Sequence, residues 1–253
     1  MEAFVKSSIK DGVGTITFFH PQSNSMPGTQ LRNLAAEVEK LGKDDSVKVI
    51  VLQSEGEKAF CAGASFDELV AINDTETGLI FFTGFASVIN AMRKAPKFVI
   101  VRVQGKAVGG GVGIASAADY AFALNGASIK LSELAVGIGP FVVGPAVERK
   151  VGKSAFCQLT INATEWQTAQ WAKEKGLYAE TFDNADQMDE AISSLAEKLS
   201  KSSPEAMAML KKVMWEGTEN WDSLLVERAG MSGKLVLSDF TKNFINSFKQ
   251  KAK

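Results

Sequence analysis

Two short, nearly continuous apolar runs constrain the fold of this 253-residue chain more than any other part of its sequence. The runs VKVIVLQSE (47–55) and PKFVIVRV (96–103) have the length of strands and show no regular polar alternation. Such runs are typical of strands that are buried on both faces of a sheet. The sequence therefore predicts an α/β fold with these two strands inside it.

A pattern of two strands and a helix recurs roughly every fifty residues over the first two thirds of the chain. It opens with a predicted β-hairpin over residues 7–19, which turns at Asp11–Gly12. Residues 29–44 then have the apolar spacing of a helix. Further on, Asn125–Gly126 lies between two strand-like segments and predicts another hairpin. The repetition is structural, because the repeated units share no obvious sequence.

Helical patterns dominate from about Thr164 to the end of the chain. Thr164 and Gln167 have the spacing of a capping box, which predicts a helix that ends at Gly176. Ser203 and Pro204 have the order of an N-cap and a first helical residue, so they predict the start of another helix.

The helix after Pro204 carries an apolar stripe, which we expect to lie in the core or against another subunit: Met207, Leu210, Val213 and Met214. We predict that residues 1–190 form the repeated ββα core. We predict that residues 191–253 form a helical region that packs on this core or on another copy of the chain.

The overall composition excludes several classes of function. The chain is 45% hydrophobic and 23% charged, with a net charge of −1 and no long basic block, which argues against nucleic-acid binding. The N-terminal segment lacks the layout of a signal peptide, and no apolar run reaches transmembrane length. We therefore expect a cytoplasmic protein with neither a nucleic-acid nor a membrane partner.

Cysteine and histidine are too scarce for several kinds of site. Cys61 and Cys157 are far apart, so neither a disulfide framework nor a zinc site is expected. His20 is the only histidine, which rules out a multi-histidine metal site and leaves one candidate for any catalytic triad. Because His20 ends a predicted strand just before a proline, we expect it to be structural, and we predict no metal.

The segment GGGVG (109–113) is a first candidate for a site of chemistry. A dinucleotide-binding fold needs a strand that runs directly into GxGxxG at the start of a helix. Here residues 104–108 separate the strand from the glycines, and Ser116 occupies the position of the third glycine. The segment therefore does not fit the nucleotide-binding pattern.

Small residues also follow the first apolar run, in FCAGAS (60–65). Glycine lets a ligand approach the main chain, and the first N–H groups of a helix have no partner within it. If the fold brings the two segments together, the N–H groups of Ala64 and Gly110 form an oxyanion hole, which stabilises a carbonyl oxygen as it gains negative charge. The alternative is a pair of glycine-rich turns needed only for packing.

Over nearly its whole length the chain resembles the crotonase superfamily, the enoyl-CoA hydratase/isomerase family. Two of the matching motifs are specific when they occur together at this spacing. The segments that carry the resemblance are ITFFHPQSNS (16–25), KAFCAGASF (58–66), GKAVGGGVGIASAADYAFA (105–123), IKLSELAVGIGP (129–140) and AKEKGLYAE (172–180). The resemblance implies a spiral of repeated ββα units, C-terminal helices that form a trimer or a dimer of trimers, and an acyl-CoA substrate without a further cofactor.

The resemblance also implies roles for individual residues. The thioester carbonyl oxygen would lie between the N–H groups of Ala64 and Gly110, with Glu133 as the acid–base residue. Lys249 either contacts the phosphates of coenzyme A bound to a neighbouring chain or lies on a solvated helix face. The remaining coenzyme A contacts would come from Gln22, Ser23, Asn24, Ala62, Ser65 and Phe66.

Hydratases of this family typically use two glutamates, and this chain has only the second, Glu133. Gly113 occupies the position of the first, and Ser65 replaces an aspartate that is common in the family. With a single glutamate at this site, the chain resembles two groups of the family. These are the isomerases and a bacterial branch that resembles methylglutaconyl-CoA hydratases. We expect hydration of an enoyl-CoA ahead of double-bond isomerisation, and the alternative of another class is a non-catalytic acyl-CoA-binding protein.

Several apolar residues follow Glu133 and are expected to surround it: Leu134, Val136, Ile138 and Phe141. Burial in such surroundings disfavours the charged form of a carboxyl group and raises its pKa. The sequence therefore predicts that Glu133 exchanges protons near neutral pH.

Overall fold

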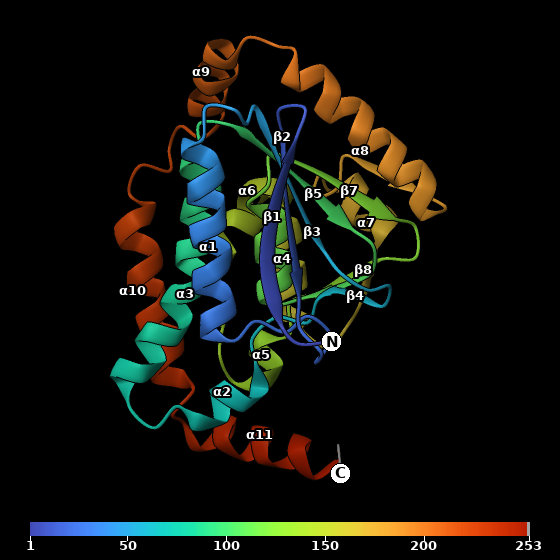
Figure 1. The fold of residues 1–253 in the computed structure, drawn as a ribbon. Helices are drawn as coiled ribbons and strands as arrows, with labels where there is room; N and C mark the ends of the chain where they lie inside the picture. Colours follow the sequence, from blue (N-terminus) through green and yellow to red (C-terminus); the bar gives the residue numbers. More distant parts are fainter. Residues whose placement is uncertain (252–253) are drawn as a thin grey trace.

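The computed structural model describes the backbone of residues 1–251 and the side chains of residues 1–247. A six-stranded sheet runs through its centre in the order β1-β2-β3-β5-β7-β10 (Figure 1). All of its neighbouring strands pair in parallel except β1 and β2, which form the predicted N-terminal hairpin. The strands are β1 (Phe4–Lys10), β2 (Val13–Phe19), β3 (Val49–Ser54), β5 (Phe98–Val103), β7 (Tyr120–Leu124) and β10 (Glu180–Phe182).

The two apolar runs form β3 and β5, which pair in the middle of this sheet. Along β3, Ile50 and Leu52 face the main core, whereas Val49 and Val51 face a second core beneath helix α8 (Ala185–Ser200). Both faces of the strand are therefore buried, as its unbroken apolar pattern predicts.

A second, four-stranded sheet has the order β4-β6-β8-β9. Its strands are short: β4 (Ala59–Cys61), β6 (Lys106–Val108), β8 (Ser128–Lys130) and β9 (Gln167–Thr168). Strands β4, β6 and β8 are parallel, and β9 is antiparallel to β8. In the repeats that begin at β3, β5 and β7 the first strand joins the large sheet and the second joins this small one, whereas β1 and β2 both belong to the large sheet. This alternation confirms the predicted spiral of ββα units.

The same alternation makes the predicted hairpin at Asn125–Gly126 wrong. Strand β7 pairs with β5 and β10, whereas β8 pairs with β6 and β9, so the turn between them carries the chain from one sheet to the other. The Asn125 side chain is bonded to the residue after β10 instead, because its Nδ2 donates to Asp183 Oδ1 at 2.6 Å. Turn chemistry marks a change of direction but does not select the pairing partner.

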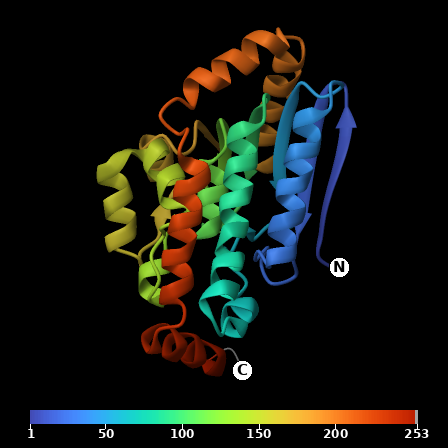
Figure 2. The ribbon, with the colours of Figure 1, turned by 90° about the vertical axis from the view of Figure 1, so that its left-hand side faces the viewer.

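Helices cover both sides of the sheets (Figures 1 and 2). Helices α1, α3 and α10 pack against one another on one side, and α8 lies on the other. The remaining bounds are α1 (Gly28–Lys43), α2 (Phe66–Ala71), α3 (Thr75–Lys94), α4 (Gly110–Ser116), α5 (Glu133–Val136), α6 (Gly144–Ile161), α7 (Ala169–Glu174), α9 (Pro204–Met214), α10 (Trp221–Leu235) and α11 (Asp239–Lys251). Within the described residues, no helix combines the length and the apolar character needed to cross a bilayer.

The structure corrects one predicted helix start and confirms another. Thr164 does not cap a helix; Thr168 caps α7, because its hydroxyl accepts from the N–H of Trp171 at 3.1 Å. Ser203 caps α9, and Pro204 is its first residue, as predicted. The capping-box pattern was misleading because residues 167–168 are used as strand β9.

The apolar stripe of α9 is only partly covered in the single chain. Met207 is buried, whereas Leu210, Val213 and Met214 are 51%, 59% and 52% exposed. The trimer that the family resemblance implies stays a prediction. The division at residue 190 also stays a prediction, and α8 runs through that position.

A buried ion pair fastens α9 to the core. The Lys211 ammonium, on a residue that is only 1% exposed, lies 2.8 Å from Asp119 Oδ2 and donates to the Met92 carbonyl oxygen at 2.7 Å. Trp215 Nε1 donates to the other carboxylate oxygen of Asp119 at 2.8 Å. Every charged atom in this cluster is satisfied, so removal of one partner leaves a buried charge.

We predict that Lys211→Met lowers the free energy of unfolding by about 3–5 kcal/mol, because Asp119 is then buried without its cation. Urea unfolding followed by circular dichroism measures the change. Lys201→Met is the matched control: it breaks an exposed pair with Glu197 and should cost less than about 1 kcal/mol. Equal losses in the two variants would contradict the assignment.

Candidate active site

Three segments of the candidate site follow three neighbouring strands of the small sheet. Ala64 comes after β4, Gly110 begins α4 after β6, and Glu133 begins α5 after β8. Because β4, β6 and β8 are parallel neighbours, their carboxyl ends meet at one edge. Ligands of α/β folds bind at such an edge. The fold therefore brings together the two segments whose proximity the sequence left open.

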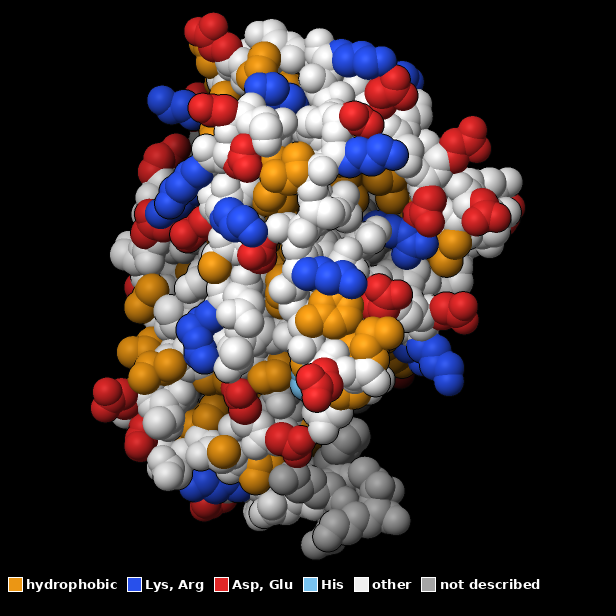
Figure 3. All heavy atoms as spheres, viewed as in Figure 1, with side chains coloured by type: hydrophobic (Ala, Val, Ile, Leu, Met, Phe, Trp, Pro, Cys, Tyr) orange, Lys and Arg blue, Asp and Glu red, His pale blue; other side chains and the backbone are white. Residues whose placement is uncertain are grey.

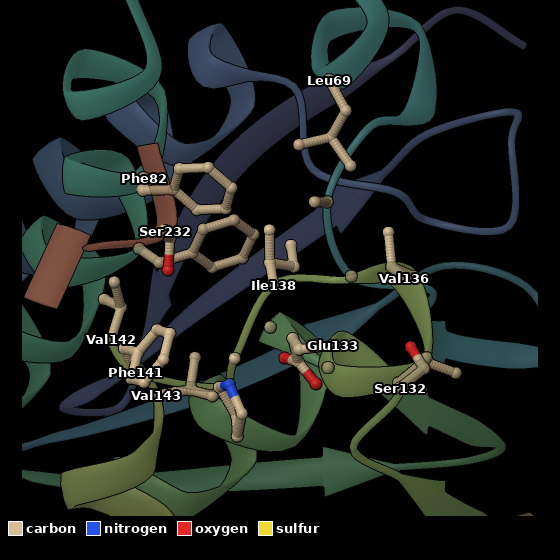
Figure 4. Close-up of a pocket in the computed structure, with 18 of the residues that line it drawn as sticks. Leu69, Phe82, Ser132, Glu133, Val136, Ile138, Phe141, Val142, Val143 and Ser232 are labelled. Atoms are coloured by element: carbon tan, nitrogen blue, oxygen red, sulfur yellow. The ribbon is translucent and has the colours of Figure 1, made fainter. Parts of the chain in front are cut away.

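A cavity of about 580 Å³, open mouth included, lies at this edge (Figure 4). Its walls are mostly apolar, and Glu133 is the only ionisable residue among the described residues that line it. The lining residues are Ala62, Gly63, Ala64, Phe66, Leu69, Phe82, Phe85, Val108, Gly109, Gly110, Ser132, Glu133, Val136, Ile138, Gly139, Pro140, Phe141, Val142, Val143 and Ser232.

Both candidate oxyanion-hole residues line the cavity with unused donors. Among the hydrogen bonds of the described residues, neither the Ala64 N–H nor the Gly110 N–H donates one. Gly63 has a φ of +85°, and a Cβ atom there would lie 2.7 Å from the Val108 carbonyl oxygen and 3.4 Å from the Gly110 nitrogen. Only glycine permits this backbone shape and this close approach of the two segments.

The Phe85 ring of α3 packs on the backbone of Gly110. A Cβ atom on Gly110 would lie 2.1 Å from Phe85 Cε1, so any side chain at this position would displace the ring. Phe85 is only 3% exposed and belongs to the main core. The position of the Gly110 N–H is thus fixed by core packing and not by a hydrogen bond.

Glu133 is half-buried as a residue, but its carboxyl group is enclosed. Oε2 is buried and has no hydrogen-bond partner. Oε1 would lie 2.8 Å from a Cβ atom on Gly109, a residue with a φ of +52°, so the carboxyl group packs directly on the glycine-rich turn. Burial raises the pKa of Glu133 to about 7, as predicted. Val136, Ile138 and Phe141 line the cavity with it, whereas Leu134 is 50% exposed and does not.

The side chain of Val143 occupies the space beside Gly113, the position of the first family glutamate. A Cβ atom on Gly113 would lie 2.4 Å from Val143 Cγ1 and 2.6 Å from Val143 Cβ. Val143 is 4% exposed and lines the cavity. A second carboxyl group at position 113 therefore has no room while Val143 is present. Gly113 and Val143 pack directly against each other.

The early loop and the first oxyanion segment are joined by backbone hydrogen bonds. The Ala62 N–H donates to Ser23 O at 3.1 Å, and the Met26 N–H donates to Gly63 O at 2.8 Å. Ser23 and Asn24 have φ values of +53° and +57°, which a tight turn requires. The early loop is thus held beside the segment that carries Ala62 and Phe66, and the coenzyme A contacts of both segments stay a prediction.

These residues differ in what they expose. Phe66 and Ala62 line the cavity, and Gln22 is exposed, with Nε2 donating to Asp67 Oδ2 at 2.9 Å. Asn24 is 3% exposed, and its Nδ2 donates to two backbone carbonyl oxygens, so it shapes the loop. Ser65 is buried and caps α2.

Lys249 and His20 are the two other residues for which the sequence suggested a role. The side chain of Lys249 lies outside the described residues. His20 accepts within its own turn, because Nδ1 lies 3.0 Å from the Ser25 hydroxyl and 3.3 Å from the Gln22 nitrogen. This geometry agrees with the structural role expected for His20.

Some of the cavity-lining residues lie on helices and were not predicted from the sequence. Leu69 comes from α2, Phe82 and Phe85 from α3, and Ser232 from α10. The spacing of the aromatic residues in α3 indicates a buried face, but it does not distinguish a core contact from a cavity wall. Ser232 carries no sequence signal at all.

The model of the enoyl-CoA hydratase/isomerase family matches residues 8–253, and the chain belongs to this family, whose membership implies an acyl-CoA substrate. The crystal structure of an enoyl-CoA hydratase from Bacillus halodurans has the same fold, with a TM-score of 0.89 at 20% identity over 96% of this chain and 99% of that chain. A short-chain-enoyl-CoA hydratase of Clostridium acetobutylicum is 27% identical over 248 residues, which cover 96% of this chain and 94% of that protein.

The similarity to methylglutaconyl-CoA hydratases is distant. The mitochondrial enzyme of Mus musculus is 30% identical over 200 residues, which cover 78% of this chain and 63% of that protein. This relationship supports membership of the family but does not single out one branch.

We predict that Gly113→Ala lowers the free energy of unfolding by about 1–3 kcal/mol, because its methyl group overlaps Val143. Val143→Gly in the same chain should recover most of the cost of the overlap, because it removes both Val143 atoms that lie within 3 Å of the added methyl group. Denaturant unfolding of the two single variants and the double variant gives the coupling between them. Simple additivity of the two single effects would contradict the packing described here.

Proposed function

We propose that this protein is an enoyl-CoA hydratase in which Glu133 is the only acid–base residue. The observation that carries the proposal is the enclosed carboxyl group of Glu133, which has an oxygen without a hydrogen-bond partner. This carboxyl group packs against Gly109, the residue before Gly110, whose N–H donates no hydrogen bond. A carboxyl group with a pKa near 7 is available in both protonation states at neutral pH. Two whole-length relatives that are named hydratases support this choice.

In the proposed reaction the thioester oxygen accepts hydrogen bonds from Ala64 and Gly110. The Glu133 carboxylate removes a proton from water as the water oxygen bonds to the β carbon, and the double-bond electrons move toward the thioester to give an enolate. Protonated Glu133 then donates that proton to the α carbon, which restores the carboxylate and completes the addition of one water molecule. Removal of one oxyanion donor typically costs about 10²–10³ in rate.

The second candidate reaction is the shift of a double bond between the 3 and 2 positions of an enoyl-CoA. Val143 favours it, because this side chain closes the place of a second carboxyl group and leaves an apolar wall beside Glu133. A single carboxyl group is sufficient: it takes a proton from the α carbon of a 3-enoyl thioester and returns one at the γ carbon. The enolate is held by the same two N–H groups.

A non-catalytic acyl-CoA-binding protein is the alternative of another class. Such a protein has no need of a buried carboxyl group beside two unused backbone donors, because an unpartnered buried carboxylate costs stability. Exchange of α protons of a bound acyl-CoA in deuterated water separates the two cases, since only the catalytic protein promotes it.

We predict that Glu133→Gln lowers kcat on the preferred substrate by about 10²–10⁴-fold, because the amide neither removes nor supplies the proton. The assay compares crotonyl-CoA, a 2-enoyl substrate, with a 3-enoyl-CoA of equal length. Turnover of the first by the unaltered protein supports hydration, and turnover of the second supports isomerisation. Undiminished turnover in the variant would rule out Glu133 as the acid–base residue.

The pH dependence follows from the raised pKa of Glu133. Because the free enzyme needs the carboxylate, we predict that kcat/KM falls as the pH drops below about 7, with a single proton taken up. The same group favours the folded state at low pH: its contribution to stability is complete below its usual pKa of 4.5 and is lost as the pH rises through 7. Glu133→Gln should abolish that loss, and a rate profile flat from pH 5 to 8 would contradict the assignment.

A further inference from the structure

Ser232 is the one polar side chain that the C-terminal helices place in the cavity wall. It lies on α10, is only 2% exposed and lines the same cavity as Glu133. Figure 4 shows Ser232 toward one end of the cavity near Val142, Ser132 toward the other end, and Glu133 between them. The serine is therefore placed where an acyl chain would end if its thioester lies beside Glu133.

The Ser232 hydroxyl has no hydrogen-bond partner in the described part of the chain. Buried helical serines usually donate to the carbonyl oxygen one turn earlier. Two other serines of this protein do so: Ser116 donates to Val112 O at 2.8 Å and Ser87 donates to Thr83 O at 3.0 Å. The Ser232 hydroxyl is therefore available to a hydrogen-bonding atom of a ligand in the cavity.

The backbone holds Ser232 firmly in place. Helices α3 and α10 cross at Gly78 and Gly233, where a Cβ atom on either residue would lie 2.8 Å from the backbone of the other. The residue next to Ser232 is therefore in direct backbone contact with α3, the helix that also supplies Phe82 and Phe85. This contact fixes the position of the Ser232 backbone at the cavity wall.

The charge of the cavity limits the chemistry of the ligand atom. Among the described residues that line the cavity, none is Lys, Arg or His, and Glu133 is negatively charged when ionised. A terminal carboxylate would be buried among Phe82, Phe85 and Val142 without a cation, which is strongly unfavourable. The partner of Ser232 is consequently an uncharged oxygen, such as a hydroxyl or a ketone.

We infer that Ser232 selects enoyl-CoA substrates whose acyl chain carries an uncharged hydrogen-bonding oxygen at its far end. The inference rests on the proposed function, because it places the thioester between Ala64 and Gly110 and directs the acyl chain away from them. It adds a substrate class: acyl chains that end in a polar, uncharged group are preferred to hydrocarbon chains and to chains that end in a carboxylate. Ser232 acts on specificity and takes no part in proton transfer.

The test uses three 2-enoyl-CoAs of equal chain length that end in a methyl, a hydroxyl or a carboxylate group. For the unaltered protein we expect kcat/KM to be about three- to tenfold higher with the hydroxyl than with the methyl compound, which is the effect of one neutral hydrogen bond. The carboxylate compound should be the slowest. Ser232→Ala should erase the advantage of the hydroxyl compound, mainly through KM.

Ser223→Ala is the matched control. Ser223 lies on the same helix but is exposed and donates to Asn220 O at 3.0 Å, so this variant should keep the order of the three substrates. Ser232→Cys serves as a second variant of similar size, because its thiol is a weak hydrogen-bond donor, and it should also lose the preference.

Three results would overturn the inference: equal rates with the hydroxyl and methyl compounds, a preference for the carboxylate compound, or an unchanged preference in Ser232→Ala. If the unaltered protein converts none of the three compounds, the proposed function fails, and the inference is then decided by binding. Calorimetric dissociation constants should follow the same order for the unaltered protein and become equal for the methyl and hydroxyl compounds in Ser232→Ala. Equal affinities in the unaltered protein would then reject it.

Discussion

At Gly63 the chain passes so close to the turn that begins α4 that a Cβ atom would lie 2.7 Å from the Val108 carbonyl oxygen and 3.4 Å from the Gly110 nitrogen. This contact is possible because β4 and β6 are parallel neighbours that end at the same edge of the small sheet. The early loop is bonded to the Gly63 segment on its other side. The remaining parts of the candidate site are arranged around this one close approach.

The apolar character of the cavity has two linked consequences. Burial raises the pKa of Glu133 to about 7 and leaves one of its oxygens without a partner. The same packing presses Val143 against Gly113 and removes the space for a second carboxyl group. The described part of the cavity therefore combines one carboxyl group that is easily protonated with a mostly apolar wall. On the outer face shown in Figure 3, by contrast, charges of both signs are interspersed.

Local sequence patterns predicted the elements that depend on near neighbours. The N-terminal hairpin, the helix over residues 28–43, the two buried strands and the Ser203 cap all follow from spacing within a few residues. The predicted hairpin at Asn125–Gly126 and the predicted cap at Thr164 were wrong. In both places the chain forms a short strand, β8 or β9, that pairs within the small sheet. Pairing across the sheet outweighs local turn and cap chemistry.

Glu133 and the two glycine-rich segments are evident in the sequence, because glycine and a lone carboxyl group are needed at particular backbone positions and occur in a recognisable motif. The residues that close the cavity around them are not evident in the sequence. Phe85 and Ser232 come from helices α3 and α10, and Val143 comes from the turn before α6, far from both in the chain. A helix spacing shows that a side chain is buried but not which other helix it meets. The motif thus identifies the family and its acyl-CoA substrate from sequence alone, whereas the shape and polarity of the acyl end of the cavity depend on how α3 and α10 cross.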